Sequence, residues 1–302
     1  MRLALGSVVH DVTHRALVMG IANRTPDSFY DRGRHYDFDA FCRHVERLVD
    51  EGADLVDVGG VRAAPGIEVT PDEEIERVVP AVAAVTSRFD VPVSVDTFRA
   101  VVLDEACRAG AVVANDISGF ADPAYLDVAA RHGATVVATH VRLGPRIHDP
   151  EPAYDDVRAE VVAFLARRVE AARARGIGAE RIIVDAGLDL GKTPAMSLEL
   201  LRHSDDLVSL ACPVLLSASN KGFLGELLGG VDVDARAAAT IGAHALGLVL
   251  GCRVLRVHDV KAARRVADLT AALLAVRAGD DPPLGAPLTR TGVADDGVEV
   301  TS

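Results

Sequence analysis

The chain has 302 residues, of which 49% are hydrophobic and 25% charged, a composition typical of a soluble globular protein. Its formal net charge of −12 argues against wrapping a nucleic-acid backbone, although a few cations and aimed N–H groups suffice to bind a small anion. The amino-terminal residues lack a signal-peptide pattern, and the most apolar stretch, 235–250, contains Arg236 and His244. We therefore expect a cytoplasmic protein with no nucleic-acid and no membrane partner.

Short apolar runs alternate with amphipathic segments along the whole chain. The runs predict buried parallel strands at roughly 16–23, 54–58, 92–96, 112–115, 134–138, 181–184, 213–216 and 253–257. The segments predict helices at roughly 39–51, 71–87, 98–109, 122–132, 155–175, 195–203, 232–249 and 259–277. One helix start has a clear mechanism, because Thr70-Pro71-Asp72-Glu73 combines an N-cap, an early proline and a capping-box glutamate.

Eight strands, each followed by a helix, are the count of a (β/α)8 TIM barrel, an α/β fold that we expect over residues 1–278. Residues 279–302 are rich in Gly, Pro and acid and have no apolar period, so we expect a disordered tail there. A doubly wound open sheet is the alternative fold, but it would carry a glycine-rich phosphate loop after its first strand. The first strand here ends in Asn23-Arg24-Thr25-Pro26-Asp27 instead, which favours the barrel.

Polar residues follow every predicted strand, and in such a barrel these strand ends meet at one mouth. Asp96, Asn115, Asp185 and Lys221 would form an array of donors and acceptors with two carboxylates. Since a carboxylate accepts two parallel N–H bonds, this array suits a flat heterocycle rich in amidine-like N–H groups.

A second group lies where the last strand meets the first. Arg256, His258 and Asn23 would form a small anion site there. A single carboxylate at a strand end is often only a helix cap or a buried structural group, and these alternatives apply to Asp259 and Asp57. Repetition on all eight strands is what favours a functional mouth.

Seven ordered motifs between about Ala16 and Leu274 resemble those of the dihydropteroate synthase family. They are TPDSF (25–29), DVGG (57–60) with Pro65-Gly66, SVDT (94–97), NDISG (115–119), LGKT (190–193), SNKGFLGELLG (219–229) and RVHDV (256–260). This family joins a pterin carrying a CH2-diphosphate to p-aminobenzoate and releases pyrophosphate, a step of folate biosynthesis. The resemblance implies a TIM barrel, usually a homodimer, assisted by Mg²⁺.

The resemblance also implies roles for individual residues. The pterin ligands of the family match the array Asp96, Asn115, Asp185 and Lys221. Its diphosphate contacts match Asn23, Arg256 and His258, with Asn23 also the magnesium contact; Lys221 joins these three in the catalytic set. Phe29 and Pro65 match the mobile loops that close over p-aminobenzoate, and Ser219 matches a neighbour of that substrate.

The chain departs from the family pattern mainly on the p-aminobenzoate side. A hydroxyl residue and an arginine that precede Pro65 in the family are alanines here, Ala63 and Ala64. The arginine of the family's Ser-Arg-Lys is Asn220, which lacks the reach and the charge of a guanidinium. The usual Asp-Pro-Gly-Phe-Gly-Phe-Gly-Lys reads Asp-Ala-Gly-Leu-Asp-Leu-Gly-Lys over 185–192, so aromatic surface is lost and a charge is added.

Three functions are therefore weighed. The first is a working dihydropteroate synthase-type transferase, to which we commit. The second is a pterin-binding paralogue without that activity, similar to the divergent second copy of actinobacteria; it would be a regulatory protein or an enzyme with another acceptor. The third is a folate-dependent methyltransferase barrel, which the TPDSF and RVHDV motifs fit poorly.

Overall fold

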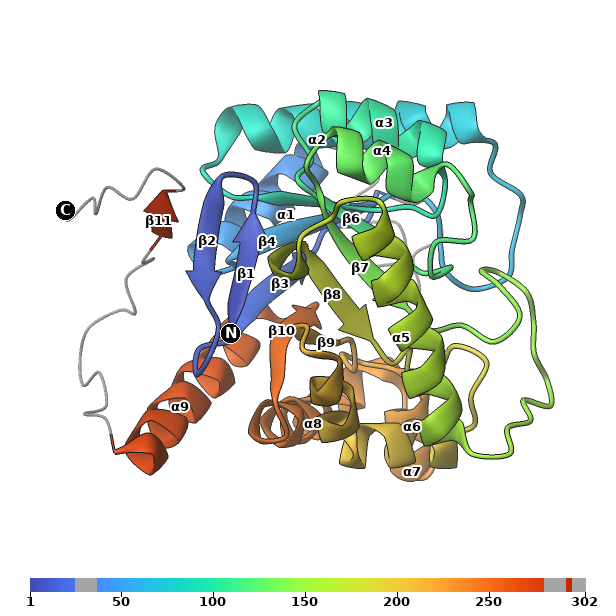
Figure 1. Ribbon diagram of the computed structural model, residues 1–302, viewed down its shortest axis with the longest axis vertical. Coiled ribbons are helices and arrows are strands. Elements are labelled where there is room, and N and C mark those ends of the chain that lie inside the picture. Colours follow the sequence, from blue (N-terminus) through green and yellow to red (C-terminus); the bar gives the residue numbers. More distant parts are fainter. Residues whose placement is uncertain (25–36, 280–291, 295–302) are drawn as a thin grey trace.

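The computed structural model describes residues 1–24, 37–279 and 292–294. Eight parallel strands form a closed barrel in the order β10-β3-β4-β5-β6-β7-β8-β9, and helices surround it (Figure 1). The strands are β3 (Leu17–Ile21), β4 (Leu55–Gly59), β5 (Val93–Asp96), β6 (Val113–Asp116), β7 (Thr135–Thr139), β8 (Ile182–Asp185), β9 (Val214–Leu216) and β10 (Cys252–Val257). The predicted TIM barrel is confirmed.

The helices that cover the barrel lie where the amphipathic segments predicted them. They are α1 (Phe38–Asp50), α2 (Pro71–Arg88), α3 (Ala100–Arg108), α4 (Tyr125–Arg131), α5 (Val157–Ala174), α6 (Pro194–Arg202), α8 (Ala237–Val249) and α9 (Val260–Ala278). A further short helix, α7 (Gly222–Leu227), was not predicted. The capping box of α2 is present: the Thr70 hydroxyl accepts from the Glu73 N–H, and the Glu73 carboxylate accepts from the Thr70 N–H. No described helix is long and apolar enough to cross a membrane.

Strand register brings the polar strand ends side by side. Asp57 of β4 pairs with Ser94 of β5, and Gly59 pairs with Asp96. Asp96 in turn pairs with Asn115 of β6. Because neighbouring parallel strands of a barrel are staggered in a fixed way, these three strands deliver their polar groups to one place at the carboxyl end.

An amino-terminal hairpin, absent from the sequence prediction, closes the opposite end of the barrel. Strands β1 (Arg2–Leu5) and β2 (Val8–Asp11) pair antiparallel. Leu3 and Leu5 pack into the apolar cluster that fills the barrel interior, together with Met19 of β3. The hydroxyl of Thr135, at the start of β7, donates to the carbonyl of Ala4, which anchors the hairpin at the amino ends of the strands.

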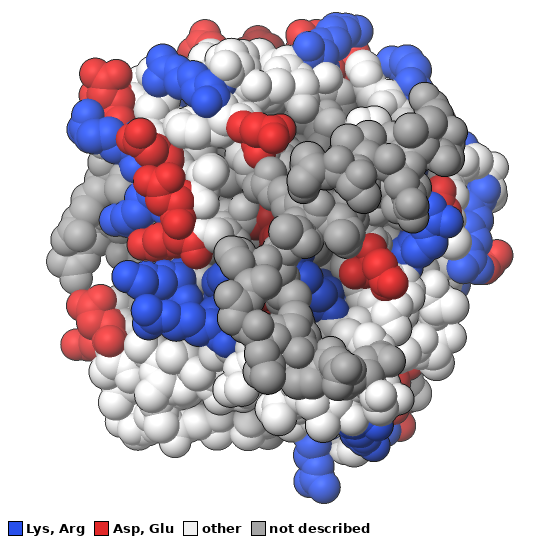
Figure 2. All heavy atoms as spheres, turned by 90° about the vertical axis from the view of Figure 1, so that its left-hand side faces the viewer, with Lys and Arg blue, Asp and Glu red and all other residues white. Residues whose placement is uncertain are grey.

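Part of the carboxyl-terminal segment pairs with this hairpin. Residues Gly292–Ala294 form a short strand, β11, antiparallel to β2. Most of the predicted tail over 279–302 lies outside the described residues, so its disorder and the domain boundary at 278 stay predictions. Figure 2 views the face at the left of Figure 1, where basic and acidic side chains lie next to one another among the residues described.

Candidate active site

Asp57 forms the buried centre of a polar cup at the mouth of the barrel. Its carboxylate accepts a 2.5 Å hydrogen bond from the Ser94 hydroxyl and 3.1 and 3.3 Å bonds from the Asn115 amide. The side chain is fully buried in an otherwise apolar strand. Sequence reasoning left Asp57 open as a structural carboxylate; its contacts show that it fixes the orientation of Asn115, which the prediction had placed at the mouth.

Arg256 lies between two carboxylates of this cup. Its Nε is 2.7 Å from Oδ2 of Asp57, and its Nη2 is 2.7 Å from Oδ2 of Asp96. Burial raises the pKa of Asp96 to about 7, against the opposing effect of the Arg256 guanidinium. Burial alone would lower the pKa of Arg256, but Asp57 and Asp96 outweigh it and the pKa is raised. Arg256 therefore joins the two groups that the sequence suggested as separate sites.

Asp185 and Lys221 form the opposite wall of the cup. Asp185, at the end of β8, accepts a 2.8 Å hydrogen bond from the Gly187 N–H. Its pKa is raised by burial, against the opposing charge of Lys221. The Lys221 ammonium donates to the carbonyl of Leu188 at 2.5 Å, and burial lowers its pKa while Asp185 raises it. Both predicted residues therefore contact the segment that follows β8, Asp185 at Gly187 and Lys221 at Leu188.

His258 follows β10 and is held by Ser219, which follows β9. The Ser219 hydroxyl lies 3.0 Å from Nδ1 of His258 and accepts a 3.2 Å hydrogen bond from the backbone N–H of His258. Burial and the neighbouring Arg256 lower the pKa of His258 to about 3, so its imidazole is neutral at physiological pH. Arg256 lies in β10 and His258 follows directly after that strand. The anion site that the sequence predicts from these two residues and Asn23 stays a prediction.

The remaining predicted site residues are less closely tied to the cup. Asn23 lies two residues after the end of β3, and its Oδ1 comes so close to Gly59 that a Cβ there would lie 2.7 Å away. Pro65 lies exposed in the segment after β4. Phe29 lies outside the described residues.

Two residues near the mouth have contacts that the sequence did not reveal. The buried Lys192 donates to Nδ1 of His140 at 2.9 Å and to the carbonyls of Gly187 and Leu190 at 2.9 and 3.0 Å. It thus ties the segment after β8 to the end of β7. A lysine close to the glycine-rich turn was the available signal, but two of these partners are backbone carbonyls, which carry no sequence signature.

Asn220 faces away from the cup. Its Oδ1 lies 3.3 Å from the Thr240 hydroxyl, and its backbone N–H donates to the same hydroxyl. It adopts a left-handed backbone (φ 57°), which asparagine tolerates better than most residues. The position that carries an arginine in the resembled family is thus turned toward α8.

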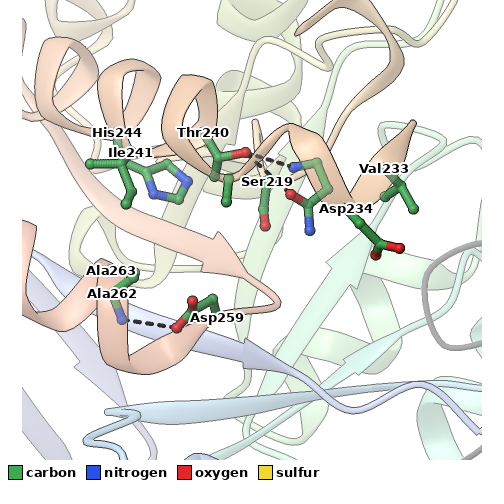
Figure 3. Close-up of a pocket in the computed structure, with 11 residues that line it drawn as sticks. Ser219, Val233, Asp234, Thr240, Ile241, His244, Asp259, Ala262 and Ala263 are labelled. Atoms are coloured by element: carbon green, nitrogen blue, oxygen red, sulfur yellow. Dashed lines mark hydrogen bonds between the residues drawn. The ribbon is translucent and has the colours of Figure 1, made fainter. Parts of the chain in front are cut away.

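A cavity of about 120 Å³ lies behind this segment, between α8 and α9. Figure 3 shows His244 and Ile241 reaching from α8 toward the turn at Asp259, with Ser219 to one side, near Thr240. Asp259 caps α9 by accepting from the Ala262 N–H at 2.9 Å, as the alternative interpretation of that residue predicted. The cavity therefore borders Ser219 on the side away from the barrel axis.

Comparisons with known proteins agree with this geometry. The family model described as "Pterin binding enzyme" matches residues 19–258. The "Inactive dihydropteroate synthase 2" of Mycobacterium leprae is 44% identical over 269 residues, covering 87% of this chain and 92% of the relative. The dihydropteroate synthase of Bacillus subtilis is 38% identical over 262 residues, covering 86% and 89%. The crystal structure of Yersinia pestis dihydropteroate synthase with a sulfonamide drug superposes with a TM-score of 0.86 at 35% identity, covering 93% of this chain and all of that one.

The closed barrel and the polar cup at the carboxyl ends of its strands define a TIM-barrel protein with a small-molecule site at its mouth. The chain belongs to the dihydropteroate synthase family of pterin-binding enzymes.

Proposed function

We propose that the chain is a dihydropteroate synthase-type transferase of folate biosynthesis. It would condense (7,8-dihydropterin-6-yl)methyl diphosphate with p-aminobenzoate and release pyrophosphate. The observation that carries this proposal is the single cup formed by side chains from β4, β5, β6, β8 and β10 and from the segment after β9. The named synthases among the relatives support the same reaction.

The cup fits a pterin because it offers buried acceptors beside a buried donor. Asp96 and Asp185 would accept the N–H groups of the pterin amidine edge, Asn115 would meet the ring edge, and Lys221 would donate to a ring acceptor. When pterin N–H groups take over Asp96, the Arg256 guanidinium loses one of its two carboxylate partners. It would then turn one N–H edge toward the diphosphate.

The second group, formed by Arg256, His258 and Asn23, would stabilise the negative charge that develops on the leaving diphosphate. The C–O bond at the pterin methylene breaks, the diphosphate keeps the electron pair, and the arylamine bonds to the carbon and loses a proton. Ser219 donating to Nδ1 of His258 would leave the ring proton on Nε2, so that the neutral imidazole donates to the diphosphate. Fixed donors of this kind stabilise the transition state more than the bound substrate, because the negative charge on the diphosphate increases as the C–O bond breaks.

Magnesium would be held largely by the substrate. The described residues contain no group of three or more His, Cys, Asp or Glu side chains able to bind a metal. The amide oxygen of Asn23 beside Gly59 fits a single protein ligand for a Mg²⁺ whose other ligands are phosphate oxygens and water. The ion would neutralise diphosphate charge.

The acceptor, p-aminobenzoate, would bind nearer the mouth of the barrel than the pterin. Phe29, Pro65 and Ser219 are proposed for this side, on the strength of the family resemblance. Homodimerisation and a cytoplasmic location are proposed on the same ground.

The decisive experiment measures pyrophosphate release with the pterin diphosphate and p-aminobenzoate. We expect Lys221→Ala to lower kcat/KM about a hundredfold, the scale seen on removing one charge-stabilising or orienting donor. Calorimetry with 6-hydroxymethyl-7,8-dihydropterin should show weakened binding to the same variant. Lys261→Ala, which removes an exposed lysine of α9, is the matched control and should leave both unchanged.

A second function is favoured by one set of observations. Ala63 and Ala64 replace polar residues of the family, Asn220 faces away from the cup, and one relative is named as inactive. A pterin-binding paralogue without synthase activity would bind the pterin with Lys221-dependent affinity yet form no dihydropteroate. That combination of results would reject the transferase and leave the binding protein.

A further inference from the structure

We propose that Lys192 is the residue that positions Asp185 and Lys221 for binding the pterin. This inference rests on the proposed function, because it takes those two side chains as pterin ligands. Lys192 lies in the segment after β8, and its ammonium contacts the protein's own backbone and one imidazole. It therefore acts through other residues, as a positioning residue rather than a ligand.

Lysine is rare in this chain, and one of its lysines is kept at a buried position. Of the 32 lysines and arginines, only Lys192, Lys221 and Lys261 are lysines. Lys261 is exposed, Lys221 is half-buried and Lys192 is buried. An ammonium is compact and donates in three directions, whereas a guanidinium is larger and donates within one plane. The position of Lys192 thus suits an ammonium.

Each N–H of the Lys192 ammonium has an acceptor. Nζ lies 2.9 Å from Nδ1 of His140, 2.9 Å from the carbonyl oxygen of Gly187 and 3.0 Å from that of Leu190. Gly187 and Leu190 are the two ends of one turn, because the Leu190 N–H donates to the Gly187 carbonyl at 3.0 Å. The ammonium therefore links both ends of this turn to the residue that follows β7.

The turn is pressed closely against the end of β7. Gly187 adopts a left-handed backbone (φ 65°), and a Cβ there would lie 2.0 Å from the carbonyl oxygen of His140. The His140 N–H in turn donates to the carbonyl of Asp185 at 3.0 Å. The position of the turn is thus set by contacts with one neighbouring segment, and Lys192 supplies the side-chain part of them.

Backbone atoms of the same turn hold both pterin-binding groups. The Gly187 N–H donates to the Asp185 carboxylate at 2.8 Å, and the Leu188 carbonyl accepts from Lys221 at 2.5 Å. Along the chain, the Gly187 carbonyl that Lys192 binds lies between these two atoms. A shift of this peptide would therefore displace the partners of Asp185 and Lys221 together.

The charge of Lys192 also acts on Asp185. Burial raises the pKa of Asp185, and Lys221, the Gly187 N–H and Lys192 lower it, in that order. Only an ionised carboxylate accepts two parallel N–H groups of a ligand. Lys192 therefore supports this form of Asp185 both directly and through the Gly187 N–H.

The test is Lys192→Met, which removes the ammonium and keeps a side chain of similar length. Calorimetry should show that 6-hydroxymethyl-7,8-dihydropterin binds about tenfold more weakly or worse, since charge-assisted hydrogen bonds of its ligands are misplaced. In the pyrophosphate-release assay, KM for the pterin diphosphate should rise by a similar factor, and kcat should change less than about twofold. This split is expected because the bound substrate and the transition state share the pterin contacts.

Two controls separate positioning from general effects. Lys261→Met makes the same chemical change at an exposed site and should leave pterin binding unchanged. Leu3→Ala removes core contacts at the opposite end of the barrel, so it should lower the free energy of unfolding without raising this KM. Equal increases of KM in Leu3→Ala and Lys192→Met would assign the effect to lost stability and overturn the inference.

NMR of isotope-labelled lysine side chains tests the same contacts in the wild-type protein, so it decides the matter even where Lys192→Met fails to fold. The three Nζ signals are assigned with Lys221→Ala and Lys261→Met. We expect the Lys192 protons to exchange with solvent far more slowly than those of Lys261, and the Lys192 signal to shift as the pterin binds. A Lys192 signal that exchanges as fast as that of Lys261 would overturn the inference.

Failure of this inference is distinguishable from failure of the proposed function. Wild-type protein that binds no pterin would reject the proposed function and the inference with it. Equally tight pterin binding by wild-type protein and Lys192→Met would overturn the inference alone, even in an active synthase. Pterin binding that depends on Lys192 without any pyrophosphate release would reject the transferase and support the positioning role.

Discussion

Single residues at this mouth carry out roles that their sequence neighbourhood reveals only in part. Alternation of apolar runs and polar ends predicts that Asp96, Asn115, Asp185 and Lys221 share one site. It could not predict that Arg256 bridges Asp57 and Asp96. These carboxylates lie 199 and 160 residues from Arg256 in the sequence, and only the folded chain brings the side chains together. For the same reason the hydrogen bond of Asn115 to Asp57 was invisible.

The raised pKa of Asp96 predicts a pH dependence of pterin binding. Only the ionised carboxylate accepts pterin N–H groups with both oxygens, and its pKa in the free protein is about 7. Binding of 6-hydroxymethyl-7,8-dihydropterin should therefore strengthen as pH rises from 5.5 toward 7.5, with a limiting slope of about tenfold per unit on the acid side. Calorimetry across this range measures it.

Asp96→Asn is the variant that tests the assignment. It should bind weakly and without this pH dependence. A slope that persists in Asp96→Asn would assign the titration to another group.

Whole elements were predicted best where their ends have a local chemical cause. The start of α2 follows from its capping box, and that of α9 from the Asp259 cap. Helix α7 was missed because its six residues include two glycines and no side-chain cap. The β1–β2 hairpin was missed because its strands have four residues each, too short for a reliable period.

Removal of the α2 cap should destabilise the protein modestly. Thr70→Ala leaves the Glu73 N–H without its side-chain acceptor, and we expect a loss of about 1 kcal/mol in the free energy of unfolding. Chemical denaturation followed by circular dichroism measures it. Ser87→Ala, at the exposed carboxyl end of the same helix, should change the stability by less than half as much.

At the scale of the whole molecule, the barrel interior is one continuous apolar cluster that includes the hairpin. Leu3 is fully buried against residues of the barrel strands. Leu3→Ala should therefore cost about 2–5 kcal/mol, since it deletes methyl groups from a site with little room to relax. Val8→Ala, on the exposed side of the hairpin, should cost under about 1 kcal/mol. Equal effects of the two changes in denaturant unfolding would show that the hairpin is not part of the core.

The hairpin also constrains how substrates enter and products leave the barrel. Because Leu3 and Leu5 pack at the amino-terminal end of the strands, the barrel is closed at that end and is not an open channel. The ligand bound deepest in the barrel would therefore leave only after the ligands bound nearer the mouth. Pyrophosphate and product would leave through the same mouth by which the substrates enter. Product release would then slow turnover even where the chemical step is fast.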